Sequence, residues 1–525
     1  METFELAVIG AGAAGLSVAA TAAAAGRRVV LVESGNFGGE CTWVGCVPSK
    51  AIIAAARRRH DALNASRFGI EVSGVTVNFP AVMAHVHDVI AQIARFEDPP
   101  HLEASGIVVR RGHAELSRAG TLARDGRTAE DERIVISVDG ERLLAERVAV
   151  CTGSSPAVPP VPGLDSVDHL TNETLFELDQ LPQRLVVLGA GPIGLEMAQA
   201  FQRLGSAVTV VDMVPDILPR EDPEAAAIAR SCLEAEGIGF VLGAKVTGAR
   251  QSGPVRRLVV EVAGEERVLE GEALLVATGR HPRTEGLGLE ALGVAVEKRG
   301  VTVDAYLRTT NPNVYAAGDV NGLMPFTHAA ANQGRLVAAN AFGRRRTKFD
   351  DRVLPWITFI DPEVAHLGMT EPEARGQYGD DIHVATLPYT AVDRAVIERS
   401  LAGVIKVITR GKPVIGHLGG GEVLGAHIVG PDAGELIHEF VLTMNTHSFA
   451  GRLAQAIHAY PSMAMGVQQA AAQLFPSGRA VAGDLRTSLR EGSGAEATDP
   501  AGSEVGSAAP GREHQVTGGP GTTPG

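Results

Sequence analysis

A glycine-rich pattern that occurs twice constrains the fold of this chain more than any other feature. Residues 4–33 and 185–212 each run from an apolar, strand-like segment through a GxGxxG turn and a helical segment to a β-branched run that ends in an acid. The first glycine and the acid are separated by the same number of residues in both copies. Two βαβ units of the dinucleotide-binding type are therefore predicted.

Each residue of the repeated pattern has a physical task. The first glycine makes a tight turn, the second lets backbone N–H groups approach a pyrophosphate, the third lets the helix pack on the strand, and the acid accepts from ribose hydroxyls. In this order the residues are Gly10, Gly12, Gly15 and Glu33 in the first copy and Gly189, Gly191, Gly194 and Asp212 in the second.

The acid of the second copy also bears on the choice of nicotinamide cofactor. The carboxylate of Asp212 pairs with a free 2′-hydroxyl and repels a 2′-phosphate. NADH is therefore favoured over NADPH, although Arg220 in the loop after the second unit leaves accommodation of a phosphate open.

The remaining segments predict an α/β fold with a further domain. Strand-like runs occur at 133–138, 147–153, 273–279 and 314–319. After about residue 350, short β-rich segments and then a helical stretch through Phe475 predict a separate C-terminal α+β domain. Beyond about Arg490 the sequence is poor in large apolar side chains and dense in Gly, Ser, Pro and Thr, and we expect it to be disordered.

Composition excludes several classes of protein. With 525 residues and a formal net charge of −14, the chain is long enough for several domains and too acidic for a protein that works by neutralising nucleic-acid phosphates. The sequence begins without a basic segment and holds no uninterrupted apolar run of membrane-spanning length, so we expect a cytoplasmic protein without a membrane span. Only four cysteines are present, so a secreted disulfide framework is excluded.

Two of the cysteines, Cys41 and Cys46, lie in GGECTWVGCVPSK at residues 38–50. On an ideal helix this spacing separates them by ~9 Å, beyond the ~7 Å limit for a disulfide, so we expect the stretch to begin as a loop that Gly45 permits. Pro48 favours a helix that starts nearby, which places Cys46 at a helix N-terminus and makes it the more acidic thiol.

The pair beside a dinucleotide turn indicates a redox-active disulfide, while buried structural thiols and half of a zinc site are the alternatives. No second Cys pair or nearby Cys/His set completes a tetrahedral zinc site, so we expect no metal site there. For Cys151 and Cys232, which lie in apolar and helical segments, we expect core packing.

Several motifs together resemble one family, the FAD-dependent pyridine nucleotide-disulfide oxidoreductases. The chain resembles it from residue 4 to about 475, closest to the branch of mercuric reductase and dihydrolipoamide dehydrogenase. The motifs are GAGAAG, GGECTWVGCVPSK, CTGSSP, GAGPIGLE, ATGRHP, NPNVYAAGDV, PWITFIDPEVAHLGMTE and VLGAHIVGPDAGELIHE.

The resemblance implies an FAD site in the first βαβ unit, an NAD(P)H site in the second, and a homodimer formed through the C-terminal domain. Electrons would pass from the nicotinamide through the flavin to a Cys41–Cys46 disulfide and on to a small-molecule or metal-ion acceptor. The implied bounds are 1–152 and 281–350 for the FAD-binding parts, 153–280 for NAD(P), 351–475 for dimerisation and 476–525 for the tail.

The resemblance also assigns individual residues. Lys50 corresponds to the lysine near the flavin N5 and Glu196 to its partner, because a cation there stabilises charge on reduced flavin. Asp319 matches the acid that binds the ribityl chain. Further cofactor contacts are implied for Ala114, Thr152, Gly153 and Gly279.

One departure limits the implied function. Thiol-reducing members carry an HxHPTxxE-like stretch with a His base and a supporting Glu, whereas this chain has Tyr460 for the base and Met465 for the acid. Tyrosine, with a usual pKa of ~10, is a poor base at neutral pH, so dithiol chemistry is disfavoured. For His458, two residues earlier, we expect an ordinary packing or surface role.

A tyrosine here is similar to mercuric reductase, whose soft cation needs thiolates and no base. The C-terminal Cys pair and N-terminal metal-binding domain of that enzyme have no counterpart in this sequence. Several functions remain open. They are electron transfer through the disulfide to a disulfide, metal-ion or other electrophilic acceptor, dihydrolipoamide dehydrogenase-type activity, direct flavin-to-quinone or oxygen reduction, and a redox-sensing subunit without turnover. Trp43, between the cysteines, either narrows access to them or packs on the flavin domain.

Overall fold

The computed structural model describes residues 1–475 except 125–126, 131 and 412–415, and for 121–124 and 127–130 only the backbone. The described residues belong to one compact unit. The tail that we expect to be disordered, 476–525, lies outside the described residues. Within the described part, no helix has both the length and the apolar character needed to cross a membrane.

The first βαβ unit forms the centre of a seven-stranded sheet. Strands run in the order β3-β2-β1-β8-β7-β4, and β20 pairs with β8. The bounds are β1 Thr3–Ile9, β2 Val29–Glu33, β3 Val108–Arg111, β4 Ala114–Arg118, β7 Ile134–Val138, β8 Glu141–Val150 and β20 Val314–Ala316. The predicted parallel pairing of β1 with β2 is confirmed.

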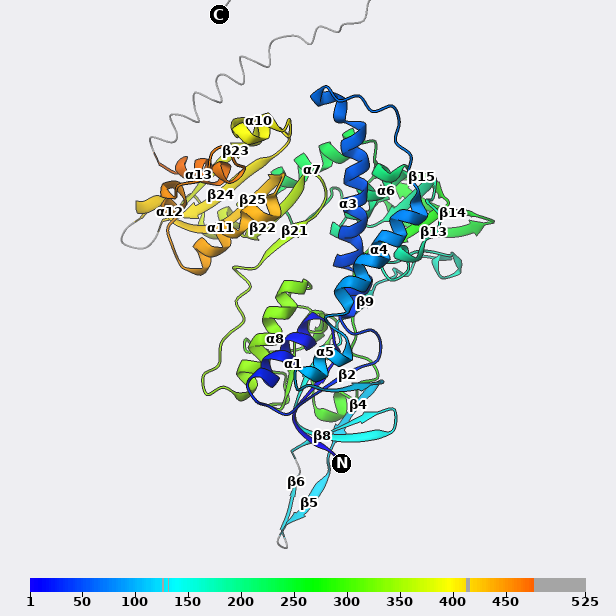
Figure 1. Cartoon of the computed structure of the whole chain (residues 1–525), viewed down its shortest axis with the longest axis vertical. Helices are drawn as coiled ribbons and strands as arrows, with labels where there is room; N and C mark the ends of the chain where they lie inside the picture. Colours follow the sequence, from blue (N-terminus) through cyan, green and yellow to red (C-terminus); the bar gives the residue numbers. More distant parts are fainter. Residues whose placement is uncertain (125–126, 131, 412–415, 476–525) are drawn as a thin grey trace, which may run out of the picture. The chain divides into compact units, whose positions relative to one another are not determined.

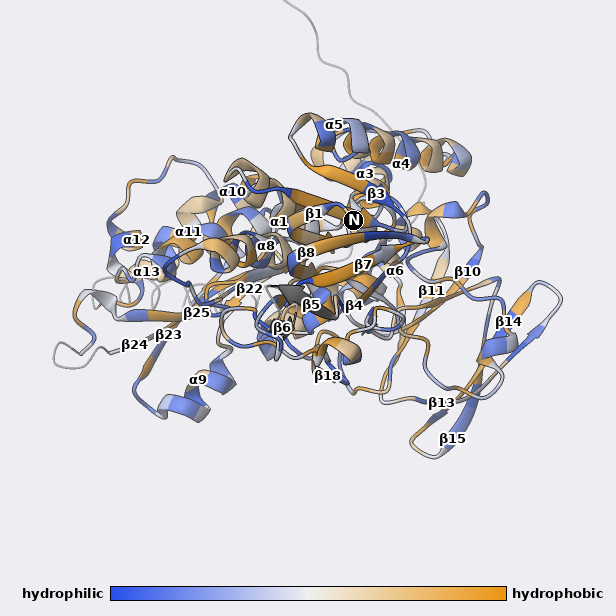
Figure 2. Cartoon of the chain, turned by 90° about the horizontal axis from the view of Figure 1, so that it is seen from below, coloured by the Kyte–Doolittle hydropathy of each residue, from blue (hydrophilic) through white to orange (hydrophobic). Residues whose placement is uncertain are grey.

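Apolar side chains of this sheet pack under two helices that are far apart in the sequence. Helix α1 (Ala13–Ala24) belongs to the repeat, whereas α8 (Thr327–Phe342) comes from more than three hundred residues later and lies beside it (Figure 1). The central strands β1, β8 and β7 are mostly hydrophobic (Figure 2). Val8, Leu31 and Ala149 are completely buried, in the same apolar core as residues of α1 and α8.

The second βαβ unit forms a smaller parallel sheet with order β12-β11-β10-β16. Its elements are β10 Arg184–Leu188, α6 Pro192–Leu204, β11 Ala207–Val211, α7 Pro223–Ala235, β12 Gly239–Val241 and β16 Ala273–Val276. The predicted β10-α6-β11 unit and its parallel pairing are confirmed. An antiparallel sheet of β13 Lys245–Ser252, β14 Val255–Val262 and β15 Glu265–Gly271 packs on it.

Two short strands and three helices connect these sheets. Strand β9 (Ser154–Pro156) pairs with β17 (Arg280–Pro282), so the chain enters and leaves the second unit at the same place. Helices α2 (Gly39–Trp43), α3 (Cys46–Leu63) and α4 (Phe79–Ala94) come after the first unit, and α3 packs against α6 through a shared apolar core. This packing brings residues of the two βαβ units into contact.

The C-terminal part is the predicted α+β domain. Its antiparallel sheet has the order β21-β22-β25-β24-β23, with bounds β21 Pro355–Thr358, β22 Glu363–Gly368, β23 Ile382–Pro388, β24 Val404–Arg410 and β25 Glu422–Gly430. Its helices are α9 Glu371–Tyr378, α10 Asp393–Ile397, α11 Ala433–Asn445, α12 Gly451–Gln455 and α13 Ala464–Ala472. Ala365, Leu367, Ala426 and Ile428 alternate along β22 and β25 and form the core under α11 and α13.

Smaller elements complete the described chain. They are α5 Pro99–Ala104, β5 Thr121–Arg124, β6 Arg127–Glu130, β18 Val296–Glu297, β19 Gly300–Val301, η1 Ala65–Phe68, η2 Leu164–Ser166, η3 Leu175–Glu177, η4 Glu290–Leu292, η5 Asp319–Asn321, η6 Tyr389–Ala391 and η7 Leu418–Gly420. The whole is a mixed α/β fold, as the sequence predicts. The bounds of the individual domains stay predictions.

Candidate active site

The two glycine-rich turns have the same internal geometry. Glu33 Oε2 accepts a hydrogen bond of 2.6 Å from the backbone N–H of Ala11, and Asp212 Oδ2 accepts one of 2.6 Å from Ala190. Both bonds span 22 residues. Each acid therefore closes its own turn and lies at the edge where a nucleotide ribose would bind.

The first and third glycines of each turn cannot carry a side chain. At Gly10 and Gly189, φ is +101° and +122°, and an added Cβ would overlap the backbone carbonyl of the residue that follows a neighbouring strand. At Gly15 and Gly194 an added Cβ would overlap the carbonyl oxygen of the first glycine. The tasks that the sequence assigns to these positions are explained by this close approach of helix to strand.

The surroundings of the turns fit nucleotide cofactors. Apart from the glycine itself and its neighbours along the chain, no described atom lies within 4 Å of where a Cβ on Gly153, Gly191 or Gly279 would sit, so a ligand can approach the backbone there. Helices α1 and α6 begin with no side-chain hydrogen bond at their N-caps, Gly12 and Gly191. Their first N–H groups are available to a pyrophosphate.

The acid expected at the ribityl chain, Asp319, lies beside the antiparallel pair of connecting strands β9 and β17. Its Oδ2 accepts a 2.6 Å hydrogen bond from Ser154 Oγ, and Arg280 Nε lies 3.6 Å from it. Arg280 also pairs with Glu40, the residue before Cys41, and Arg283 Nη2 lies 2.8 Å from Glu40 Oε1. This polar cluster links the cysteine-bearing helix α2 to the β9–β17 strand pair.

Burial of Glu40 makes the cluster electrostatically unusual. Desolvation raises the pKa of Glu40, although the charges of Arg280 and Arg283 act against that rise. Two other residues are predicted to contact the cofactors. The hydroxyl of Thr152 donates to the carbonyl of Arg283 at 2.6 Å, and Ala114 is buried at the start of β4.

The cysteine stretch differs from the expected loop. Cys41 lies in the short helix α2, and Cys46 is the first residue of α3. The helix breaks between them at Val44 and Gly45, where an added Cβ would lie 2.8 Å from the carbonyl oxygen of Glu40. The loop expectation was wrong because a short break, rather than a whole loop, is enough to bring the two sulfurs together. The placement of Cys46 at a helix N-terminus is confirmed.

A threonine that no sequence motif singles out contacts both sulfurs. The hydroxyl of Thr327, in the first turn of α8, donates to Cys41 Sγ at 3.2 Å and lies 3.4 Å from Cys46 Sγ. Cys46 is exposed and Cys41 partly buried. The only signal in the sequence is that Thr327 comes shortly after the NPNVYAAGDV motif, at the start of a helix.

The two thiols are electrostatically unequal. The hydrogen bond with Cys41 lowers the pKa of Cys46 to about 6, and the Thr327 hydroxyl and the Lys50 charge act in the same direction against burial. The same pairing, together with burial, raises the pKa of Cys41. At neutral pH the reduced pair therefore consists of a Cys46 thiolate and a Cys41 thiol.

Lys50 and Glu196 form the ion pair that the resemblance implies. Lys50 Nζ lies 2.7 Å from Glu196 Oε2, although the residues are 146 positions apart. Glu196 is buried, and its Oε1 accepts a 2.9 Å hydrogen bond from the backbone N–H of Phe359. The lysine also lies 4.5 Å from the centre of the Phe359 ring. Glu196 and Phe359 together fix the cation one helical turn beyond Cys46.

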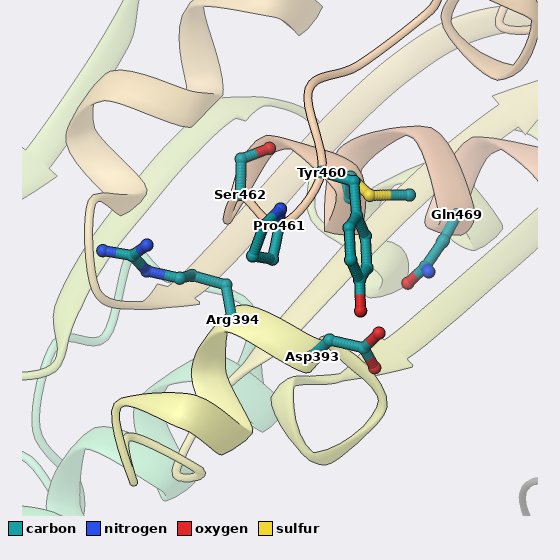
Figure 3. Close-up of a pocket in the computed structure, with 7 residues that line it drawn as sticks. Asp393, Arg394, Tyr460, Pro461, Ser462 and Gln469 are labelled. Carbon is teal, nitrogen blue, oxygen red and sulfur yellow. The ribbon is translucent and has the colours of Figure 1, made fainter. Parts of the chain in front are cut away.

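Tyr460 lies in the C-terminal domain, away from the cysteines of its own chain. It lines a small pocket with Asp393, Arg394 and Gln469, and Figure 3 shows its hydroxyl directed at the Asp393 carboxylate. This hydrogen bond raises the pKa of Tyr460. The tyrosine is 69% exposed, so a second chain can cover it.

His458 is committed to contacts within its own domain. Its Nε2 lies 2.9 Å from Glu439 Oε2 and its Nδ1 3.0 Å from the Ala456 carbonyl oxygen. Both ring nitrogens are therefore engaged. A packing or surface role for His458 stays a prediction. Cys151 is buried, as expected for core packing, whereas Cys232 is only partly buried.

Two further side chains bear on access and cofactor choice. Because of Arg220, the sequence leaves binding of the NADPH 2′-phosphate undecided. The guanidinium carbon of Arg220 lies 5.0 Å from the centre of the Trp356 ring. Trp43 donates its indole N–H to the Phe37 carbonyl at 2.8 Å and packs on the core below α3. Of the two roles considered for Trp43, these contacts favour packing.

Comparison with known proteins places most of the chain in one group. Residues 4–334 match the family model of pyridine nucleotide-disulphide oxidoreductases, and residues 354–471 match the dimerisation domain of the same family.

Curated relatives fall into two kinds. A mercuric reductase from Streptomyces lividans is 37% identical over 480 residues, which cover 90% of this chain and 96% of the relative. A dihydrolipoyl dehydrogenase from Thermus scotoductus is 34% identical over 482 residues, which cover 90% and 98%.

A solved structure is similar along nearly the whole described chain. The HOCl-induced flavoprotein disulfide reductase RclA from Escherichia coli, as its Cu(II) complex, is 29% identical with a TM-score of 0.76, and the match covers 90% of this chain and 100% of that one.

Proposed function

The chain belongs to the pyridine nucleotide-disulphide oxidoreductase family, and from that premise we propose that it transfers electrons from NADH through the Cys41–Cys46 pair to a thiophilic metal ion. Members of this family are FAD-dependent NAD(P)H oxidoreductases that act on sulfur groups or metal ions, and this chain is one of them. The metal acceptor, the preference for NADH and the residue roles are the proposal.

FAD held at the first turn by Glu33 and the N-terminus of α1, with Asp319 nearby, would supply a hydride acceptor for the nicotinamide and a path for an electron pair to the disulfide. The residues of this chain then control the charge and the proton on the two sulfurs. Cleavage of the Cys41–Cys46 S–S bond takes up two electrons and one proton, which yields the Cys46 thiolate and the Cys41 thiol. Thr327 donates to whichever sulfur carries charge, and Lys50 lowers the cost of a thiolate beside the flavin.

The acceptor is inferred from the absence of a base where a dithiol substrate would need one. The Asp393 contact raises the pKa of Tyr460, so the hydroxyl keeps its proton at neutral pH. Both ring nitrogens of His458 are occupied. A soft metal ion binds thiolates directly, so its reduction requires no base that moves a proton to or from a substrate thiol. This single observation, a protonated tyrosine in the base position, carries the proposal.

The oxidative half-reaction balances with metal ions. Cys41 and Cys46 together lose two electrons and one proton as the S–S bond re-forms. These electrons reduce one Hg(II)-type ion to the metal or two Cu(II)-type ions to Cu(I). Cys41 and Cys46 are both needed, because the electron pair comes from the two thiols together.

The preference for NADH rests on the second turn. Asp212 keeps a carboxylate at the ribose edge, and the Arg220 guanidinium stacks on Trp356. A 2′-phosphate would meet the Asp212 charge without compensation from Arg220.

A homodimer would bring Tyr460 to the site of the partner subunit. The matched dimerisation domain supports this arrangement. So do the exposed apolar side chains near Tyr460 and on α11, because Ile457 is 100% exposed and Leu442 64%.

The acceptor proposal is tested by NADH oxidation with the FAD-loaded enzyme. Hg(II) and Cu(II), each supplied as a thiol complex, are compared with oxidised glutathione, lipoamide and a soluble quinone. We expect metal-dependent turnover at least about tenfold above turnover with either disulfide, and loss of it in Cys46→Ser. Equal rates with lipoamide would contradict the proposal, and quinone turnover that survives Cys46→Ser would favour direct electron transfer from the flavin.

A further inference from the structure

A buried cluster outside the redox site joins the second βαβ unit to the C-terminal sheet. Glu221 lies in the segment before α7, His366 on β22 and His427 on β25, and all three are less than a tenth exposed. One ligand atom from each lies within 4.8 Å of the other two. The redox chemistry proposed above uses none of them.

The sheet itself aligns the two histidines. His366 and His427 are directly opposite each other on antiparallel strands, with ring centres 4.6 Å apart. Their neighbours Ala365 and Ala426 point into the apolar core on the other face. The histidine side chains therefore project together from the face on which Glu221 lies.

Each histidine is oriented as a metal ligand is. His366 Nε2 lies 2.8 Å from the Gly368 carbonyl oxygen, and His427 Nε2 lies 2.9 Å from that of Met369. Because a carbonyl only accepts, each Nε2 carries its proton. Ligating histidines commonly hold their second nitrogen in this way, which leaves Nδ1 free to coordinate.

One inner nitrogen has no partner among the described residues, and the other faces a carboxylate oxygen. His427 Nδ1 is buried and has no hydrogen-bond partner among the residues that the structure describes. His366 Nδ1 lies 3.0 Å from Glu221 Oε2. Since His366 Nε2 already donates, this contact requires either a doubly protonated ring or a cation between the two acceptors. A separation of 3.0 Å is near that of adjacent ligands on one zinc-sized ion.

The surrounding groups support a charged site. The other oxygen of Glu221 accepts a 2.6 Å hydrogen bond from Trp356 Nε1, which fixes the carboxylate. The nearby Lys406 is already compensated, because its Nζ lies 2.7 Å from Asp222, 2.8 Å from Glu224 and 3.2 Å from Glu371. A cavity of about 420 Å³ lies next to the cluster, and Glu221, Trp356 and His366 are among the residues that line it.

We propose that Glu221, His366 and His427 form a binding site for a divalent metal ion of the zinc class. Two imidazoles and one carboxylate are a donor set that zinc accepts, with the cavity side left for water. The ion would fasten the segment that leads from the nucleotide-binding strand β11 to α7 onto the C-terminal sheet. It is separate from the thiophilic ion that the cysteines would reduce.

The test measures metal binding directly, in a background where the redox thiols do not compete. FAD-loaded Cys41→Ser/Cys46→Ser protein, freed of metal by chelation, is titrated with Zn(II) by calorimetry and with Co(II) by visible absorption. We expect one saturable equivalent per chain and Co(II) bands of nitrogen and oxygen ligation without thiolate charge transfer.

Matched variants assign the ligands. His366→Gln, His427→Gln and Glu221→Gln should each weaken Zn(II) binding at least tenfold, whereas His101→Gln, which removes an exposed imidazole on α5, should not. Glu221→Gln keeps an oxygen for Trp356, so it guards against loss of the fold, which FAD content and circular dichroism monitor. No saturable binding, or equal binding by the three variants and the parent, would overturn the proposal. Neither result depends on which acceptor the enzyme reduces.

Discussion

The hydroxyl of Thr327 donates a hydrogen bond to Cys41 Sγ at 3.2 Å, across 286 positions of sequence. The same oxygen lies 3.4 Å from Cys46 Sγ. A single side chain at the first turn of α8 thus contacts both members of the cysteine pair. Its hydroxyl can donate to whichever sulfur carries the negative charge as the pair is reduced and reoxidised.

Replacement of Thr327 by valine should raise the pKa of Cys46. In the parent protein this pKa is lowered to about 6, so the thiolate is present above about pH 6 and is lost below it. A hydrogen bond to a charged group contributes about 1.5–3 kcal/mol, and about 1.4 kcal/mol corresponds to one pKa unit. Thr327→Val should therefore shift the pH profile of alkylation of the reduced enzyme upward by about 1–2 units. Thr327→Ser, which keeps the hydroxyl, should leave it in place, and equal profiles for all three proteins would contradict the assigned contact.

Restoring the base should create dithiol activity. The double variant Tyr460→His/Met465→Glu supplies the pair that thiol-reducing relatives carry. General-base catalysis contributes about 10²–10⁴-fold, so we expect NAD⁺ reduction by dihydrolipoamide to rise by at least about tenfold. Tyr460→Phe should leave dithiol activity as low as in the parent. A parent enzyme already as fast as the double variant would show that no base is missing.

Substitutions at two glycines of the second nucleotide turn should have different effects, one on nucleotide binding and the other on stability. Among the described residues, nothing lies within 4 Å of a Cβ added at Gly191, whereas one added at Gly194 overlaps the Gly189 carbonyl oxygen. Gly191→Ala should therefore keep the melting temperature of the parent and raise the KM for NADH. Gly194→Ala should lower the melting temperature itself. An unchanged KM in Gly191→Ala would mean that the nucleotide does not approach this backbone.

Loss of the charge at Asp212 should relax the nucleotide preference. Asp212→Asn keeps an oxygen that can accept from the Ala190 N–H but no longer repels a 2′-phosphate. A charge-assisted hydrogen bond to the ribose is worth about 1.5–3 kcal/mol, so the ratio of kcat/KM for NADH to that for NADPH should fall by at least about tenfold. A parent enzyme that already prefers NADPH would contradict the role given to Asp212.

Local patterns in the sequence predict the parts of the fold that depend on neighbouring residues. Both βαβ units are predicted by glycines and acids at fixed spacing, and the start of α3 at Cys46 is predicted by Gly45 and Pro48. The prediction of a loop around Cys41 was wrong. The helix is broken only at Val44 and Gly45, so the residues before this break form the short helix α2.

Contacts between distant segments leave no such pattern. Thr327 reaches the cysteines only because α8 packs beside α1. Arg280 reaches Glu40 across 240 positions because β9 and β17 pair with each other. Glu221 meets His366 across 145 positions. A search for ligands near the cysteines in sequence could not find that cluster, because the sheet of the C-terminal domain assembles it.

The central claim, that electrons pass through the Cys41–Cys46 disulfide, is tested most directly by an anaerobic NADH titration of the FAD-loaded protein with its visible spectrum recorded. A long-wavelength charge-transfer band should appear before the flavin bleaches, because the Cys46 thiolate then lies against oxidised FAD. The band should be absent in Cys46→Ser. Direct bleaching of the parent enzyme without this band would contradict the claim and show that electrons bypass the cysteine pair.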